Sequence, residues 1–373
     1  IMPRKQFKSS ELLPTSTHPM GASALFAGRN AEVPDVEPIY GNRPITEKKN
    51  FKLLFQGKKP YWMPRAGWAF CDINNFRPRL NPDNVVTHLV FDNQGPYPYE
   101  SNTMRSSWFD LDWVFVPVAG GATVKPGNPK IEDMNDWRDI VSMPDLDALD
   151  YEGCTLKDKD YLNTRQYNEL GILSGFWERL ISLMDVSGAA IALIDEDQQD
   201  AVKDFFEENA NMLIEYIRRI KKYNDIDGVL IHDDWGTQKS GFFSLDTAME
   251  MLVPYLRKVT DAVHDMGMYF QLHSCGKNEA LVPAYIAAGV DLWCPQPLND
   301  IEKLAKQYKD EPIWFGQQFA NIPMDTPEDE CIRLADEWFN KYKDLHVIPG
   351  FSDAPQAFSD ELYRISRQTW VEE

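Results

Sequence analysis

The amino-acid sequence predicts an α/β fold, a (β/α)8 TIM barrel with an extended N-terminal arm and an insertion after the second strand. Three observations predict this class. Eight short apolar segments recur along the chain, and most precede a stretch with the three- and four-residue apolar spacing of an amphipathic helix. Polar side chains also gather directly after several of these segments, where a barrel of parallel strands carries its active site. The expected strands lie near residues 61, 110, 172, 229, 270, 291, 313 and 347.

The first 50 residues are rich in Pro, Ser, Thr and charge, and they show no sustained periodicity. We expect an extended arm that wraps the domain or contacts a second subunit of a homodimer. Residues 51–373 are then expected to form one barrel domain, since a chain of this length suffices for a single (β/α)8 unit.

The first two strands are expected at Pro60–Arg65 and Trp108–Pro117. Residues 122–165 are polar, with a short helix at Asn135–Val141. So long a run outside the regular alternation predicts an insertion over one face of the barrel.

From residue 171 onward the alternation becomes regular. The expected strands are 171–176, 227–233, 268–273, 290–294, 312–316 and 346–350, and the expected helices are 201–223, 244–266, 277–287, 299–309, 327–344 and 356–370. A doubly wound open sheet is the alternative. It lacks support because no Gly-rich phosphate loop opens a helix.

Composition excludes several classes of partner. The formal net charge of −20 predicts an acidic surface that repels phosphate backbones, which argues against a nucleic-acid partner. No apolar run approaches the roughly 20 residues that span a bilayer. Five irregularly spaced cysteines and no signal-peptide pattern favour a reducing cytoplasm over a disulfide framework.

A candidate metal site follows the strand near residue 270. His273 and Cys275 are two residues apart, so on an extended chain their side chains point to the same side. A neutral imidazole and a thiolate can occupy two corners of a tetrahedral zinc site. Gly276 ends the strand. The alternative is a packed histidine and an inert buried cysteine.

Charged residues follow other strands. Asp233 and Asp234 are adjacent and point to opposite sides, so at most one faces the barrel axis. We expect Asp233 to serve as ligand, general base or substrate acceptor, unless one of the pair anchors the next loop. Arg65 could hold an anionic substrate group or form a rim salt bridge. Asp110 and Asp112 share one side of their strand and matter only if that side is inward.

Aromatic residues lie near the same strand ends. Phe176, Trp177 and Trp235 could wall a pocket for an apolar or planar ligand, although packing in the core is the alternative. Cys294 ends the sixth expected strand and offers either a further thiolate or a buried structural cysteine.

These motifs together resemble the uroporphyrinogen decarboxylase superfamily of (β/α)8 barrels. The resemblance is best over residues 171–360. It rests on residues 233–238 (DDWGTQ), 255–267 with their terminal VHDMG, 273–276 (HSCG), 288–292 (AGVDL) and Gly316, and at the front on residues 60–67 (PYWMPRAG).

The resemblance implies one of two chemistries. Corrinoid-linked methyltransferases of the superfamily bind zinc through a His-x-Cys pair and a late Cys, whereas the decarboxylases use no cofactor and rely on arginines and a late His. This sequence keeps His273, Cys275 and Arg65. It departs at Trp68, where the decarboxylases have a second arginine, and at Phe351, where either branch has its late residue. Candidates for the third ligand are Asp353, Glu178 and Cys294, besides Asp233.

We therefore predict a zinc-assisted methyltransferase that moves a methyl group between a small methylated compound, such as a methoxyl compound, and a corrinoid carried by a partner protein. Zinc on His273 and Cys275 would act as a Lewis acid. The alternative is a cofactor-independent decarboxylase of a tetrapyrrole or related carboxylate. A tetrapyrrole-binding module without activity is the non-enzymatic alternative.

Overall fold

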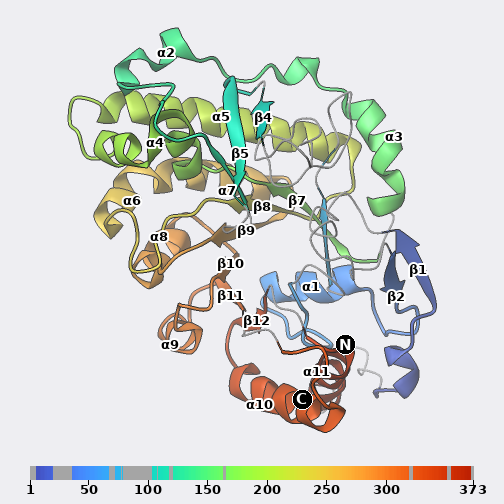
Figure 1. Ribbon diagram of the computed structural model, residues 1–373. Coiled ribbons are helices and arrows are strands. Elements are labelled where there is room, and N and C mark those ends of the chain that lie inside the picture. Colours follow the sequence, from blue (N-terminus) through green and yellow to red (C-terminus); the bar gives the residue numbers. More distant parts are fainter. Residues whose placement is uncertain are drawn as a thin grey trace.

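The centre of the molecule is a curved parallel β-sheet (Figure 1). The computed structural model describes residues 6–19, 36–66, 72–76, 78, 103–106, 108–116, 121–162, 165–318, 322–350 and 354–370. Within these residues the sheet has seven strands in the order β12-β11-β10-β9-β8-β7-β3. They are β3 (Ile73–Phe76), β7 (Tyr167–Ile172), β8 (Gly228–His232), β9 (Tyr269–Ser274), β10 (Leu292–Pro295), β11 (Trp314–Gln317) and β12 (Val347–Pro349). The predicted α/β, barrel-type class is confirmed.

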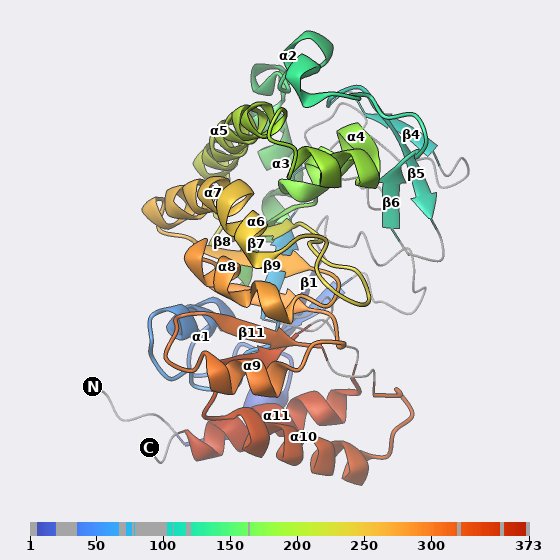
Figure 2. The same ribbon diagram turned by 90° about the vertical axis from the view of Figure 1, so that its left-hand side faces the viewer.

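Helices follow the strands and cover the outside of the sheet (Figures 1 and 2). They are α4 (Trp177–Ala192), α5 (Gln199–Tyr223), α6 (Leu245–Met251), α7 (Val253–Asp265), α8 (Val282–Ala287), α9 (Ile301–Gln307), α10 (Glu328–Tyr342) and α11 (Gln356–Thr369). The one helix expected over 244–266 is two helices. They meet at Leu252, because Pro254 in the first turn of α7 has no N–H to continue the α6 ladder.

The expected first strand, Pro60–Arg65, is not a strand. It carries two prolines, which cannot donate to a sheet ladder. The segment instead lies at the seam between β12 and β3. There the Ala66 N–H donates to the Pro349 carbonyl oxygen at 2.9 Å, and the Asp72 N–H donates to that of Arg65 at 3.1 Å. The edge strand of the parallel sheet is β3.

The expected second strand also lies elsewhere. It is β5 (Leu111–Val116), which pairs antiparallel with β4 (Thr103–Ser106) and β6 (Gly121–Val124), apart from the central sheet (Figure 2). Leu111 and Trp113 are buried whereas Asp112 is exposed, the alternation typical of an antiparallel strand with one wet face. Along the chain, this small sheet, α2 (Trp137–Ile140) and α3 (Tyr151–Leu162) come after β3 and before β7.

The N-terminal region contains regular structure that was not expected: a 3-10 turn (Ser9–Leu12), paired strands β1 (Ser16–Pro19) and β2 (Val36–Ile39), and α1 (Glu47–Phe55). The turn packs against α11. The buried Glu11 carboxylate accepts hydrogen bonds from Arg367 Nε at 2.8 Å and from the Tyr363 hydroxyl at 2.7 Å. On the same helix Ser366 Oγ accepts from the Met63 N–H at 2.8 Å. None of the described helices is long and apolar enough to cross a membrane.

The concave side of the sheet holds a buried carboxyl group. Glu169 on β7 is 3% exposed, and its Oε2 accepts from Asn75 Nδ2 at 3.4 Å. Burial, and after it the negative charge of Glu169 when ionised, raises the pKa of the Cys294 thiol on β10. Two strands separate β7 from β10 in the sheet, so this interaction crosses the concave side. Burial raises the pKa of Glu169 to about 8, against the weaker lowering effect of Asn75.

Candidate metal centre

Three side chains that can bind a metal converge just beyond the carboxyl ends of β8 and β9. Asp234 follows β8, His273 lies in β9, and Cys275 follows it. One ligand atom from each lies within 4.8 Å of the other two, and His273 Nε2 is 3.2 Å from Cys275 Sγ. Among the described residues this is the group of three or more His, Cys, Asp or Glu side chains with such spacing. It includes both ligands predicted from the His-x-Cys spacing.

The loops after the two strands are locked together. The Cys275 N–H donates to Asp234 Oδ1 at 2.6 Å. Gly276 has φ +94°, and a Cβ there would come within 2.2 Å of the Gly236 carbonyl carbon. Only glycine allows this backbone conformation and this close approach. The side-chain amide of Asn278 then donates to the Cys275 carbonyl oxygen at 2.7 Å. The relative position of Asp234 and Cys275 is therefore set by backbone contacts.

The electrostatics of the group suit a cation. Burial lowers the pKa of His273, while the Asp234 carboxylate opposes this change, so the ring is held toward the neutral form that binds metals. Burial raises the pKa of the Cys275 thiol, and the negative charges of Asp234 and Glu178 raise it further. A thiolate here thus needs a compensating positive charge. Imidazole, thiolate and carboxylate are ligands that Zn²⁺ accepts, so the donor set fits that ion.

Glu178, one of the predicted third ligands, lies beside this group. It is in the first turn of α4, and its carboxyl group accepts a hydrogen bond from the Asp234 N–H. Burial first, and then the charges of Asp234 and Asp233, raise its pKa well above the usual value. Its Oε2 is buried, and no described residue donates to it. An orphaned oxygen of this kind is a place for a ligand or ion to bind.

Asp233, expected to be the functional member of the aspartate pair, has a different position. Its carboxylate accepts from the N–H groups of Phe176 at 2.9 Å, Trp177 at 3.2 Å and Glu178 at 2.8 Å, and from Trp235 Nε1 at 2.8 Å. Burial raises the pKa of Asp233 to about 6, and these hydrogen bonds act against burial. It therefore anchors the N-terminus of α4, and Asp234 is the member of the pair that lies in the candidate metal group.

The three aromatic residues expected to bind substrate are buried completely. Trp177 packs against Phe242 and Phe243, with ring centroids 5.3 and 5.4 Å apart. Trp235 packs against Tyr285 at 5.2 Å, and Phe176 against Phe206 at 5.5 Å. Their exposure is 0%, so they form the core behind the site. The interpretation as pocket walls finds no support in these contacts.

Trp235→Phe tests this packing role. The substitution removes the indole N–H that bonds to the buried Asp233 carboxylate and leaves space in the core, so we expect unfolding to become easier by about 2 kcal/mol. Urea denaturation measures this change. Zinc content and substrate affinity should stay at wild-type values, and a weakened affinity without loss of stability would contradict the assignment.

The thiol of Cys294 and the guanidinium of Arg65, both described, are not part of this group. Cys294 Sγ accepts from Gln271 Nε2 at 3.3 Å and lies against Gly316, where a Cβ would come within 2.4 Å of it. The charge of Arg65 acts on Tyr40, Asp72 and Asp360. Asp353, Phe351 and Trp68 lie outside the described residues.

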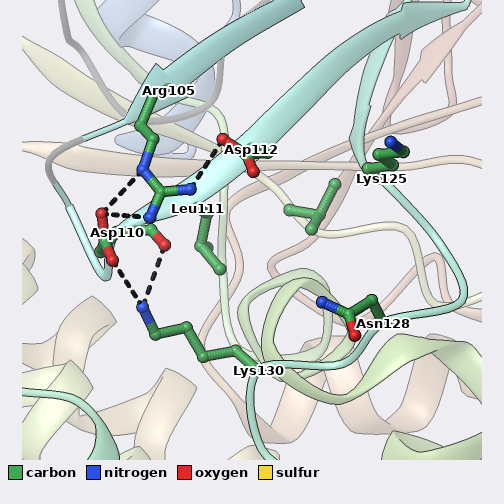
Figure 3. A pocket seen from close by; sticks show the side chains of 8 residues that line it. Arg105, Asp110, Leu111, Asp112, Lys125, Asn128 and Lys130 are labelled. Atoms are coloured by element: carbon green, nitrogen blue, oxygen red, sulfur yellow. Dashed lines mark hydrogen bonds and ion pairs between the residues drawn. The ribbon is translucent and has the colours of Figure 1, made fainter.

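Asp110 and Asp112 point outward into an exposed ion-pair network (Figure 3). Arg105 bonds to Asp110 at 2.7 Å and to Asp112 at 2.8 Å, and Lys130 bonds to Asp110 at 2.9 Å. These carboxylates are satisfied by neighbouring cations at the surface. They take no part in the metal group.

A cavity of about 840 Å³ adjoins the metal group. It lies between α4 and the small antiparallel sheet, and both Asp234 and Glu178 line it. The sequence did not predict this cavity, because α4 was not among the expected helices. Asp185, with φ +59°, interrupts this helix after about two turns.

Comparisons with known proteins support the fold. No protein-family model matches the chain, and no curated protein matches it. Among solved structures it resembles a methyltransferase from Methanosarcina mazei, with 12% sequence identity, a TM-score of 0.56, and coverage of 88% of this chain and 100% of that one. It also matches TsXylA, an intracellular xylanase from Thermoanaerobacterium saccharolyticum JW/SL-YS485, at 10% identity over 56% and 72% of the two chains, but its TM-score of 0.34 is too low to argue from. The chain therefore shares its fold with the Methanosarcina mazei methyltransferase.

Proposed function

We propose that the protein is a zinc-assisted methyltransferase, which moves a methyl group between a small methylated compound, such as a methoxyl compound, and a corrinoid bound to a partner protein. The observation that carries this proposal is the convergence of Asp234, His273 and Cys275 within 4.8 Å at the carboxyl ends of adjacent strands. The fold shared with a protein described as a methyltransferase adds support.

In this proposal His273, Cys275 and Asp234 would hold the ion, a set of three protein ligands as in catalytic zinc sites. Bound zinc would supply Lewis-acid polarisation of the substrate heteroatom. The chain itself supplies the rest. The Cys275 N–H orients the Asp234 carboxylate, Asn278 fixes the loop that carries the thiol, and Glu178 offers a buried oxygen to the substrate.

The metal is tested on protein purified without chelator. We expect about one zinc per chain in the wild type. His273→Ala and Cys275→Ala remove a ligand, so zinc affinity should fall by more than the roughly 10–100-fold typical of residues behind the ligands. Mass spectrometry of the metal content measures this loss. Cys331→Ala, a buried cysteine in α10 whose thiol donates to the Thr326 carbonyl, is the control that should keep zinc. Zinc absent from the wild type, or unchanged in both ligand variants, would refute the metal role.

The reaction is tested by incubating the zinc-loaded protein with methylated compounds and a reduced corrinoid protein, and by following methylation in the corrinoid absorbance. The alternative, a decarboxylase, predicts release of carbon dioxide from uroporphyrinogen that resists chelators and is lost in Arg65→Ala. The geometry favours methyl transfer, because the described residues that line the adjoining cavity include no Lys, Arg or His to bind a substrate that carries many carboxylates.

A further inference from the structure

We propose that the cavity between α4 and the small antiparallel sheet is the substrate pocket, and that it selects an uncharged or cationic methylated compound with an apolar body. The inference rests on the proposed function and adds to it the chemical class of the substrate. We call this space the α4 cavity.

The α4 cavity has the size and position of a substrate site. Its volume of about 840 Å³ is within the range of small-molecule pockets, about 300–1,000 Å³. One wall is α4, the other is β5 and β6, and Asp234 also lines it. Figure 2 shows α4 facing the small sheet. Because Asp234 belongs to the metal group, a compound in the cavity would reach the ion.

Most of the α4 cavity wall is apolar. The side chains that give it this character come from both walls and include Trp113, Val116, Val124, Ile181, Val186 and Ala190. Such a surface takes an apolar body, since burying it removes apolar area from water.

The titratable side chains that line the cavity are all acidic. Glu178, Asp185 and Asp234 line it, and the described lining residues include no Lys, Arg or His. Arg179 follows Glu178 and partly offsets its charge, but its guanidinium lies over the Phe109 ring at 4.6 Å, and it does not line the cavity. A carboxylate, sulfonate or phosphate on the ligand would therefore find no basic side chain to pair with among the described lining residues.

Glu178 also provides the polar contact. Its Oε2 is buried without a donor among the described residues, while a second contact to the Asp234 N–H holds the side chain in place. A buried acceptor without a donor is costly unless a ligand supplies one. The structure thus assigns to Glu178 the recognition of a positive or hydrogen-bond-donating head group.

The shape of the cavity depends on a break in α4. Asp185 has φ +59° and ψ 167° within the helix, a backbone conformation that residues other than glycine rarely adopt. Its Oδ2 accepts from the Gly127 N–H at 2.9 Å, which ties the break to the loop after β6. The second half of α4 is thereby turned, and its Val186 and Ala190 complete the wall.

The test uses three probes of similar size: phenyltrimethylammonium, methoxybenzene and benzenesulfonate. Each is titrated calorimetrically into the zinc-loaded wild type. We expect the cation and the neutral ether to bind, and the sulfonate to bind at least about 10-fold more weakly. Glu178→Gln should weaken binding of the cation about 10-fold and of the ether less, because an NH2 group replaces one carboxyl oxygen and turns its positive hydrogens toward a positive head group. Ala190→Trp fills the cavity and should abolish binding of all probes.

Two controls make the outcome decisive. Asp112→Asn, in the outward network of Figure 3, should leave every titration unchanged. Should Ala190→Trp fail to fold by circular dichroism, the isosteric Glu178→Gln carries the test. Equal binding of all three probes, or binding unaffected in a folded Ala190→Trp, would overturn the pocket.

Zinc is measured on the same samples to separate this proposal from the proposed function. Protein that holds zinc but binds no probe overturns the pocket alone. Protein that lacks zinc and still prefers the cation supports the pocket, while the proposed function falls.

Discussion

Asp233→Ala is expected to lower the free energy of unfolding by about 3–4 kcal/mol. The substitution removes one buried carboxylate and leaves the backbone N–H groups of Phe176, which caps α4, and of the first two residues of α4 without an acceptor. The Trp235 indole N–H also loses its acceptor. Buried donors without partners carry their full desolvation cost. Urea denaturation followed by circular dichroism, on protein stripped of metal, measures the change.

The adjacent Asp234→Ala is the matched comparison. Asp234 accepts one backbone N–H, that of Cys275, so its removal should cost only about 1 kcal/mol, while zinc binding is lost. Two neighbouring aspartates would thus have opposite phenotypes. Loss of zinc in Asp233→Ala with unchanged stability would return that residue to the ligand set.

Glu169→Gln is expected to stabilise the protein increasingly as pH rises from 5 to 9. Burial raises the pKa of Glu169 from 4.5 to about 8. Between these values the unfolded chain ionises while the folded protein keeps its proton, so wild-type stability is lost as pH rises through the folded pKa. Glutamine has no proton to lose. The free energy of unfolding of the variant should therefore exceed that of the wild type by as much as about 5 kcal/mol near pH 9, and the difference should then level off.

Urea denaturation at pH 5, 7 and 9 tests this expectation. Glu132→Gln, an exposed glutamate, serves as the control and should change stability by the same amount at each pH. A Glu169→Gln curve parallel to that of the wild type would mean that the carboxyl group is ionised in the folded protein and meets an unrecognised cation.

Five strands of the parallel sheet, β8 to β12, could be predicted because their apolar runs are buried on both faces, as in β8, and each is bounded by a helix. The strand expected at 171–176 shares only residues 171 and 172 with β7, whose first half carries the polar Asn168 and Glu169. The strands at the front of the barrel could not be predicted. Pro60–Arg65 has the aromatic and apolar content of a strand, but its prolines lack the N–H groups of a ladder. The segment of β5 has the apolar content of a barrel strand, but its alternating burial is typical of an antiparallel sheet with one face exposed to water.

At the site, the spacing of His273 and Cys275 was sufficient to predict that their side chains lie together, because side chains two residues apart share one side of a strand. The sequence did not predict which of Asp233 and Asp234 joins them. It depends on which residue ends β8, and a change of one residue moves every side chain to the opposite face. Sequence pattern does not fix strand ends to that accuracy. The burial of Trp177 and Trp235 likewise depends on packing by Phe243, which comes from a loop.

The seam between β12 and β3 has a consequence for biosynthesis. Glu11 and Arg367 pair across 356 residues, and Met63 and Ser366 across 303. At the usual ribosomal speed of about 5–20 residues per second, the N-terminal region waits roughly 20–70 s for its partners in α11. During that interval its apolar segments remain exposed in the nascent chain, where they can meet chaperones or other nascent chains. Closure of the seam should therefore be among the last steps of folding on the ribosome.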